Sequence, residues 1–267
     1  MTEHAYGPRP LKSSGPLADD GEVMVARRPR RGVQVLPSLF TLANMFCGYA
    51  CVVYAMRGEY ATAAPLSGIA VVLDMLDGRI ARMTGTTSEF GVQFDSMADV
   101  ISFGMAPAIL AFAWGLSALG RLGWAAAFLF VTAAALRLAR FNVQAGSTDK
   151  RYFIGMPSPA AAGVVAATVF AYPEGFSEIQ FAAPLVLLVV VPAGLMVSTI
   201  RYRAFKSFDT QSRHPFRLLI LFAVFITALV TRPQEVLVLL AYGYLVSPLI
   251  GAVLARLRRP PEPAPAG

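Results

Sequence analysis

The chain has 267 residues, of which 56% are hydrophobic and only 15% are charged, and its mean hydropathy is +0.57. This composition excludes an ordinary soluble domain and predicts an integral membrane protein. The net charge of +7 does not indicate nucleic-acid binding, because the lysines and arginines flank apolar segments and do not form one contiguous basic face.

Two polar tails flank the apolar part of the chain. Residues 1–32 are rich in Gly, Pro and Ser and contain the run Arg-Arg-Pro-Arg-Arg at 27–31, so we expect a disordered basic tail that lies against anionic headgroups in the cytoplasm. Residues 258–267 are rich in proline and predict a second disordered tail. The segment between them, 33–257, is predicted to form one transmembrane domain.

Eight apolar segments follow one another closely along this domain. Each approaches the length of about 17 to 25 residues that a transmembrane helix needs. The sequence therefore predicts an all-α integral membrane protein, a polytopic bundle of about eight transmembrane helices. The segments lie at about 34–56, 60–82, 92–118, 123–141, 157–173, 179–200, 215–231 and 235–256.

The distribution of basic residues predicts the orientation of this bundle. An even number of spans places both termini on the same side of the membrane. With that topology, all of the 23 lysines and arginines except Arg57, Arg121 and Arg232 fall on one side. The positive-inside rule assigns this side to the cytoplasm. We therefore expect both termini and the polar site described below to face the cytoplasm.

The first predicted helix carries polar or small residues inside its apolar run. Asn44 must find a polar partner there, because an unpaired amide is costly in a membrane. Thr41 and Gly48 fit close packing against a neighbouring helix as well as they fit a binding site.

Four aspartates lie at helical spacing where the second predicted helix ends and the third begins. Asp74 and Asp77 are three residues apart, and Asp95 and Asp99 are four apart, so each pair shares a helix face. Converging carboxylates in a poorly solvated place repel one another unless cations neutralise them, and oxygen ligands suit magnesium, manganese or calcium. The pattern predicts a site for two divalent cations.

Gly78 and Arg82, which lie close to these aspartates in the sequence, have features that suit a phosphate ligand. Gly78 lacks a side chain, so a ligand can approach its backbone closely, and Arg82 offers a cationic fork that suits phosphate. Intramembrane aspartates also occur in divalent-cation carriers, which is the alternative interpretation. A carrier predicts carboxylates spread through the depth of the bilayer, whereas these lie at one cytoplasmic level beside Gly78 and Arg82.

The string Asp74-x2-Asp77-Gly78-x2-Ala81-Arg82-x8-Gly91-x3-Asp95-x3-Asp99 matches the signature of the CDP-alcohol phosphatidyltransferases at every fixed position. The chain resembles this family over roughly residues 33–255. The resemblance implies transfer of a phosphatidyl group from CDP-diacylglycerol to an alcohol, with release of CMP. It also implies two divalent cations, Mg²⁺ or Mn²⁺, and a homodimer.

The same resemblance assigns roles to individual residues. Asp74, Asp77, Asp95 and Asp99 become the metal ligands, and Asp99 also takes the proton of the acceptor hydroxyl. Ser88 is predicted to cap the third helix ahead of Glu89, and the resemblance adds a contact with the nucleotide. The predicted CDP-diacylglycerol-binding residues are Gly78, Ala81, Arg82, Ser88, Gly91, Asn44 and Thr41.

Three further stretches resemble the phosphatidylserine synthase branch of bacteria and archaea. These are Arg-Leu-Ala-Arg-Phe-Asn at 137–142, Gly-Met-Pro-Ser-Pro-Ala at 155–160, and Asp-Val-Ile-Ser-Phe-Gly-Met-Ala-Pro at 99–107. This resemblance implies L-serine as the acceptor, phosphatidylserine as the product, and a location in the bacterial cytoplasmic membrane.

A candidate serine site follows from the first of these stretches. Arg137 and Arg140 share a helix face, so their guanidinium groups can both reach one carboxylate, and Asn142 lies next to them. Arginines at a cytoplasmic helix end also serve as plain membrane anchors. The alternative is a related enzyme of the same family that uses glycerol 3-phosphate or inositol phosphate as the acceptor. The basic residues Arg137, Arg140, Lys150 and Arg151 do not exclude such a phosphorylated alcohol.

Overall fold

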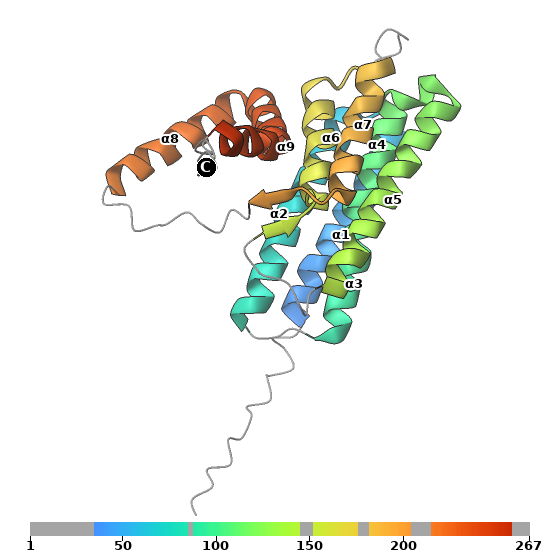
Figure 1. Cartoon of the computed structure of the whole chain (residues 1–267). Coiled ribbons are helices and arrows are strands. Elements are labelled where there is room, and N and C mark those ends of the chain that lie inside the picture. The colour runs from blue at the N-terminus through green and yellow to red at the C-terminus, as the bar shows by residue number, and fades with distance from the viewer. Residues whose placement is uncertain (1–34, 85–87, 145–151, 176–181, 204–214, 258–267) are drawn as a thin grey trace, which may run out of the picture.

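A computed structural model describes residues 35–84, 88–144, 152–175, 182–203 and 215–257 (Figure 1). The predicted tails 1–32 and 258–267 lie outside these residues. The described helices follow the order of the predicted apolar segments. They are α1 (Val35–Met56), α2 (Tyr60–Thr84), α3 (Glu89–Asp99), a π-helical turn (Val100–Met105), α4 (Ala106–Trp114), a 3-10 turn (Leu116–Leu119), α5 (Arg121–Gln144), α6 (Ser158–Ala171), α7 (Ala182–Val197), α8 (Pro215–Thr231) and α9 (Pro233–Leu257).

The lengths of these helices support an integral membrane protein but do not by themselves give eight spans. Helices α6 and α7 have 14 and 16 residues, so they rise only about 21 and 24 Å, less than the roughly 30 Å of a hydrocarbon core. Helices α8 and α9 form one further candidate span only if this bent pair is treated as a single span. Four described stretches are long and apolar enough to cross a membrane: Ser38–Met56, Tyr60–Ile80, Glu89–Trp114 and Arg121–Val143.

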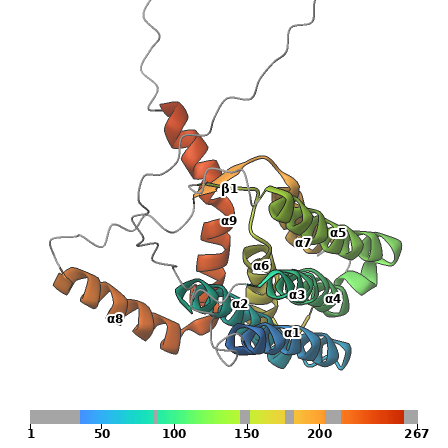
Figure 2. The ribbon, with the colours of Figure 1, turned by 90° about the horizontal axis from the view of Figure 1, so that it is seen from below.

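Helices α1 to α7 lie side by side in one bundle, seen from the side in Figure 1 and from below in Figure 2. Helix α1 packs against α2, α4 and the π-helical turn, and α5 packs against α7. The interior is rich in alanine, and its largest buried side chains include Phe103, Leu110 and Phe130. Small residues let helix backbones approach closely, which is how helices in membranes gain packing energy.

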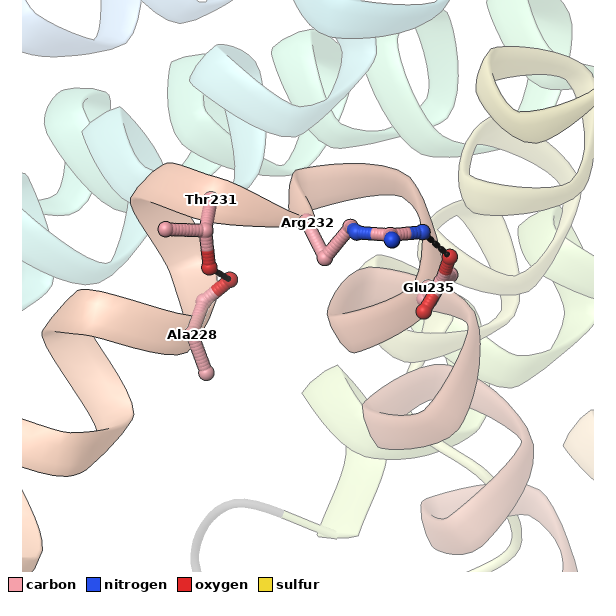
Figure 3. Close-up of polar contacts among 4 residues, drawn as sticks. All are labelled: Ala228, Thr231, Arg232 and Glu235. Carbon is pink, nitrogen blue, oxygen red and sulfur yellow. Dashed lines mark hydrogen bonds and ion pairs between the residues drawn. The ribbon is translucent and has the colours of Figure 1, made fainter.

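Helix α9 lies against α6, whereas α8 lies away from the bundle in both views (Figures 1 and 2). The two helices meet at a corner of 118°. Pro233 begins α9, and a proline cannot continue the backbone hydrogen bonds of the preceding helix. Figure 3 shows this corner, where Arg232 donates a hydrogen bond to Glu235 at 2.7 Å and the Thr231 hydroxyl donates to the carbonyl of Ala228 at 3.3 Å.

One short antiparallel ribbon departs from the predicted all-α class. Strand β1 (Tyr152–Ile154) pairs with β2 (Arg201–Arg203), next to the start of α6 and the end of α7. Gly155 follows β1 with φ of +83° and leaves no room for a side chain beside the carbonyl of Met196. The apolar periodicity did not predict this ribbon, because its two strands have only three residues each.

Candidate active site

Three of the four predicted metal ligands meet between α2 and α3. Asp74 of α2 and Asp95 and Asp99 of α3 each offer one carboxylate oxygen, and these oxygens all lie within 4.8 Å of one another. Asp95 and Asp99 share a face of α3 because one helical turn separates them. The convergence expected from the spacing of these three aspartates is therefore present.

The buried oxygens of this cluster fit a hard divalent cation. The Oδ1 atoms of Asp95 and Asp99 are buried and have no hydrogen-bond partner among the described residues. Folded proteins seldom leave buried polar atoms unpaired, and carboxylates this close repel one another. A divalent cation with a preference for oxygen ligands, such as Mg²⁺ or Mn²⁺, satisfies such oxygens and offsets the repulsion. The acidic cluster of Asp74, Asp95 and Asp99 is thus a suitable donor set for a metal.

Asp77 lies on the same helix as Asp74 but has a different environment. Its side chain is only 3% exposed and accepts a hydrogen bond from the Thr41 hydroxyl at 3.1 Å. Thr41 is itself buried on α1, so this contact ties α1 to α2. Among the described residues, the group of close ligand oxygens comprises Asp74, Asp95 and Asp99 and does not include Asp77. Metal binding by Asp77 stays a prediction.

Asn44 on α1 is a fully buried amide with unused hydrogen-bonding capacity. Its side chain is 0% exposed, and neither Nδ2 nor Oδ1 has a partner among the described residues. Its backbone carbonyl accepts a hydrogen bond from the Ser102 hydroxyl at 3.1 Å. An unsatisfied buried amide costs free energy of about 1 to 3 kcal/mol. The Asn44 side chain thus has hydrogen-bonding capacity that no described residue uses.

Close packing fixes the turn that follows Asp99. The π-helical turn Val100–Met105 packs against α1, and a Cβ atom at Gly48 would lie 2.6 Å from Ser102 Oγ and 2.8 Å from Ser102 Cα. Such π-helical turns occur often at functional sites. The absence of a side chain at Gly48 is thus what lets α1 contact the chain three residues beyond Asp99.

The remaining predicted donor-site residues lie on α2 and at the start of α3. Ser88 caps α3, because its hydroxyl accepts a hydrogen bond from the Gly91 backbone N–H at 3.0 Å, as the sequence predicts. Gly78 is half-buried on α2. The side chains of Ala81 and Arg82 lie outside the described part of the structure.

The three residues of the predicted serine site make separate contacts. Arg137 donates to the Ser158 hydroxyl at 2.7 Å and interacts electrostatically with Asp99 and Asp74. Arg140 instead donates to the backbone carbonyls of residues 197 and 198, both at 3.4 Å, where α7 ends. Asn142 donates to the hydroxyl of Ser96 at 3.0 Å. Of the three, Arg137 is the one joined electrostatically to the acidic cluster.

The sequence did not single out two side chains that contact the site residues. Ser158 accepts the hydrogen bond of Arg137, and it lies within the stretch Gly-Met-Pro-Ser-Pro-Ala, so its position in that motif was a usable signal. Ser102 contacts α1 from within the similarly distinctive stretch at 99–107.

The chain is similar to known phosphatidyltransferases over most of its length. The family model of CDP-alcohol phosphatidyltransferase matches residues 34–196. A Helicobacter pylori protein named CDP-diacylglycerol–serine O-phosphatidyltransferase is 40% identical over 227 residues, which are 83% of this chain and 92% of the relative. A Mycobacterium leprae protein of the same name is 31% identical over 82% of this chain and 75% of its own length. An archaetidylserine synthase of Methanothermobacter thermautotrophicus is 37% identical over 62% of this chain and 69% of its own length.

The helices and the acidic cluster define the class as an integral membrane protein with a candidate site for divalent cations. The match to the family model and the extent of the similarity to these relatives then identify the family. The chain belongs to the CDP-alcohol phosphatidyltransferases.

Proposed function

We propose that the protein transfers the phosphatidyl group of CDP-diacylglycerol to the hydroxyl of L-serine, giving phosphatidylserine and CMP. The observation that carries this proposal is the 40% identity to a serine O-phosphatidyltransferase over 92% of that relative's length. The acidic cluster of Asp74, Asp95 and Asp99 supports it, because converging carboxylates can bind the divalent cations that stabilise charge during phosphoryl transfer.

The four aspartates hold two divalent cations, with Asp77 kept in place by Thr41. When bound, Mg²⁺ or Mn²⁺ neutralises the diphosphate and stabilises the charge of the leaving CMP. Asn44 offers its unpartnered amide to the donor substrate, and Arg82 offers a cation to a phosphate. The CDP-diacylglycerol site consists of Gly78, Ala81, Arg82, Ser88, Gly91, Asn44 and Thr41.

Asp99 acts as the general base. The serine hydroxyl oxygen forms a bond to the phosphorus that carries diacylglycerol, and the bond from this phosphorus to the oxygen of CMP breaks. The hydroxyl proton passes to the Asp99 carboxylate and from there to water. A free aspartate is a weak base for a hydroxyl, so Asp99 accepts the proton late, as the new bond forms.

The serine carboxylate binds near Arg137, Arg140 and Asn142, and the two arginines are expected to contribute unequally. Arg137→Ala should raise the KM for serine by about tenfold or more, because it removes a charged partner of the carboxylate close to Asp99. Arg140→Ala should change this KM less, since Arg140 donates to carbonyls at the end of α7. Initial rates over a range of serine concentrations measure both effects. An unchanged KM for serine in Arg137→Ala contradicts this serine site.

The proposed setting is the bacterial cytoplasmic membrane. Eight transmembrane helices place both termini and the acidic cluster on the cytoplasmic side, and two copies form a homodimer. Reporter fusions at both termini test the orientation, and light scattering of the purified protein in detergent tests the dimer. A periplasmic terminus or a monomeric mass would contradict the corresponding part of this proposal.

Incorporation of isotopically labelled L-serine into lipid tests the proposed reaction and its metal requirement together. With CDP-diacylglycerol and Mn²⁺ or Mg²⁺, purified protein should produce labelled phosphatidylserine, identified by mass spectrometry. Removal of divalent cations with a chelator should abolish the incorporation, and addition of excess metal should restore it, because the carboxylates otherwise repel one another and the diphosphate. Full activity after exhaustive chelation would contradict the metal role of the acidic cluster.

A further inference from the structure

A buried hydroxyl at the start of α6 holds the guanidinium of Arg137. Arg137 Nη1 donates a hydrogen bond to the Ser158 hydroxyl at 2.7 Å, and Ser158 is only 2% exposed. On α5 itself, Arg137 Cζ lies 5.9 Å from the ring centroid of Phe141, which is one helical turn further along. A cation over an aromatic face is attracted to the ring. The hydroxyl and the ring together therefore restrict the orientation of this guanidinium.

Backbone contacts fix the place of Ser158 relative to the end of α7. The backbone N–H of Gly155 donates to the carbonyl of Ile200 at 2.8 Å, and that of Met156 donates to the carbonyl of Leu195 at 2.9 Å. Gly155 has a φ of +83°, a conformation that favours glycine, and a Cβ atom there would overlap the backbone of α7. The segment that leads into α6 is thus held on α7, and it carries the Ser158 hydroxyl with it.

Helix α5 packs in a fixed register against α3 and the π-helical turn. A Cβ atom at Gly104 would lie 3.2 Å from the Cβ atom of Ala134. Nearer the end of α5, Asn142 Nδ2 donates a hydrogen bond to the Ser96 hydroxyl at 3.0 Å. Asn142 follows Ala134 by eight residues, and Ser96 precedes Gly104 by the same number, so the two segments run antiparallel in one register.

This register places Arg137 at the depth of the acidic cluster. Arg137 lies three residues beyond Ala134, so it is level with Ile101, three residues before Gly104. Asp99 is two residues from Ile101, which corresponds to about 3 Å along the helix axis. The cation that Ser158 holds therefore lies at the level where the proposed base and the acceptor must meet.

A serine hydroxyl can orient a guanidinium without cancelling its charge. The hydroxyl is neutral, so Arg137 keeps its positive charge for an anionic ligand, whereas a carboxylate in the place of Ser158 would offset that charge. The guanidinium has five N–H donors in a fixed plane, and the bond to Ser158 uses one of them. A guanidinium that is already oriented loses less rotational freedom when it binds a carboxylate.

We propose that Ser158 is a positioning residue of the acceptor site, and that its hydroxyl orients the Arg137 guanidinium for the carboxylate of the amino-acid acceptor. This inference rests on the proposed function, because an amino-acid acceptor supplies the carboxylate. It gives the start of α6, and the backbone contacts that hold it on α7, a role in recognition of the acceptor.

Steady-state kinetics of Ser158→Ala in the full-length protein test this inference. The KM for serine should rise about fivefold, as expected for the loss of one hydrogen bond, while kcat and the KM for CDP-diacylglycerol change by less than about twofold. Alanine is smaller than serine and adds no bulk at this buried position. A fall in kcat with an unchanged KM for serine would overturn the inference.

Thr168→Val is the matched control for Ser158→Ala. It also removes a hydroxyl from α6, at a position where that hydroxyl donates to the carbonyl of Val164 and lies 3.0 Å from the hydroxyl of Tyr242. The KM for serine should stay unchanged in this variant. Equal effects of the two variants on that KM would overturn the inference, and so would aggregation of Ser158→Ala alone, because the hydroxyl would then serve the fold.

A double-mutant cycle tests whether Ser158 acts through Arg137. In the Arg137→Ala background, Ser158→Ala should raise the KM for serine by no more than about twofold, because the group that Ser158 orients is gone. Effects of the two substitutions that multiply would overturn the inference, since Ser158 would then act on serine independently of Arg137.

The wild-type protein tells failure of this inference from failure of the proposed function. If the wild type uses serine and Ser158→Ala keeps the wild-type KM for serine, the inference alone is overturned. If the wild type transfers the phosphatidyl group to another alcohol and not to serine, the proposed function fails first, and the inference is overturned with it.

Discussion

Asp99→Asn is expected to lower turnover with serine by about 10³-fold or more while CDP-diacylglycerol still binds. The amide cannot accept the hydroxyl proton, and the loss of a general base typically costs about 10² to 10⁴-fold in rate. The substitution would also weaken one metal ligand, which adds to the loss in turnover. The other two oxygens of the cluster, from Asp74 and Asp95, stay in place to support donor binding.

Two measurements on the same purified variant check this expectation. CMP release gives turnover, and binding of radiolabelled CDP-diacylglycerol in mixed micelles gives donor affinity. Glu89→Gln is the matched control, because it changes a carboxylate to an amide on the same helix at an exposed position. It should retain turnover. Loss of donor binding together with turnover in Asp99→Asn would assign Asp99 a purely structural or metal-holding role.

Gly48→Ala is expected to cause the second large loss, by a steric route. The new methyl group would lie within 2.6 Å of Ser102 Oγ and 2.8 Å of Ser102 Cα, so α1 and the π-helical turn must move apart. Overpacking of this kind typically costs about 1 to 3 kcal/mol of stability. Because Ser102 follows Asp99 by three residues, we also expect turnover to fall by at least about tenfold, as a misplaced catalytic group does.

Gly68→Ala on α2 is the control for Gly48→Ala. A Cβ atom at Gly68 would meet nothing within 4 Å, so alanine there should be neutral or stabilise the helix by up to about 1 kcal/mol. Thermal stability in detergent, followed by size-exclusion chromatography after heating, compares the two variants alongside turnover. Equal stability and full turnover in both would contradict the tight contact between α1 and the π-helical turn.

Much of the helical architecture could be predicted from the sequence, because apolar runs and their polar ends are local features. The first predicted segment, 34–56, corresponds to α1 at Val35–Met56, and the second, 60–82, to α2 at Tyr60–Thr84. The π-helical turn could not be predicted in this way. It packs against α1 where Gly48 lies close to Ser102, and these two residues are far apart in the sequence. Likewise, the sequence predicts the segments 215–231 and 235–256 as two separate spans and does not indicate the 118° bend between α8 and α9.

The site likewise has some features that local sequence spacing predicts and others that depend on contacts between distant segments. Helical spacing predicted that four aspartates converge; Asp74, Asp95 and Asp99 do so, whereas Asp77 is not in this group of close oxygens among the described residues. Helical spacing also predicted a shared face for Arg137 and Arg140, but each side chain takes a different partner, Ser158 in one case and the end of α7 in the other. These partners come from distant segments, so no local pattern could reveal them. The same holds for the hydrogen bond from Thr41 to Asp77.

Acceptor-dependent release of CMP is the most direct test of the central claim. Purified protein in detergent would receive CDP-diacylglycerol and Mn²⁺ or Mg²⁺, with serine, glycerol 3-phosphate or inositol 1-phosphate in parallel reactions. We predict CMP release that requires both the metal and serine. Release with glycerol 3-phosphate or inositol 1-phosphate and none with serine would contradict the proposed acceptor and the role given to Arg137, although the acidic cluster would keep its place in phosphatidyl transfer.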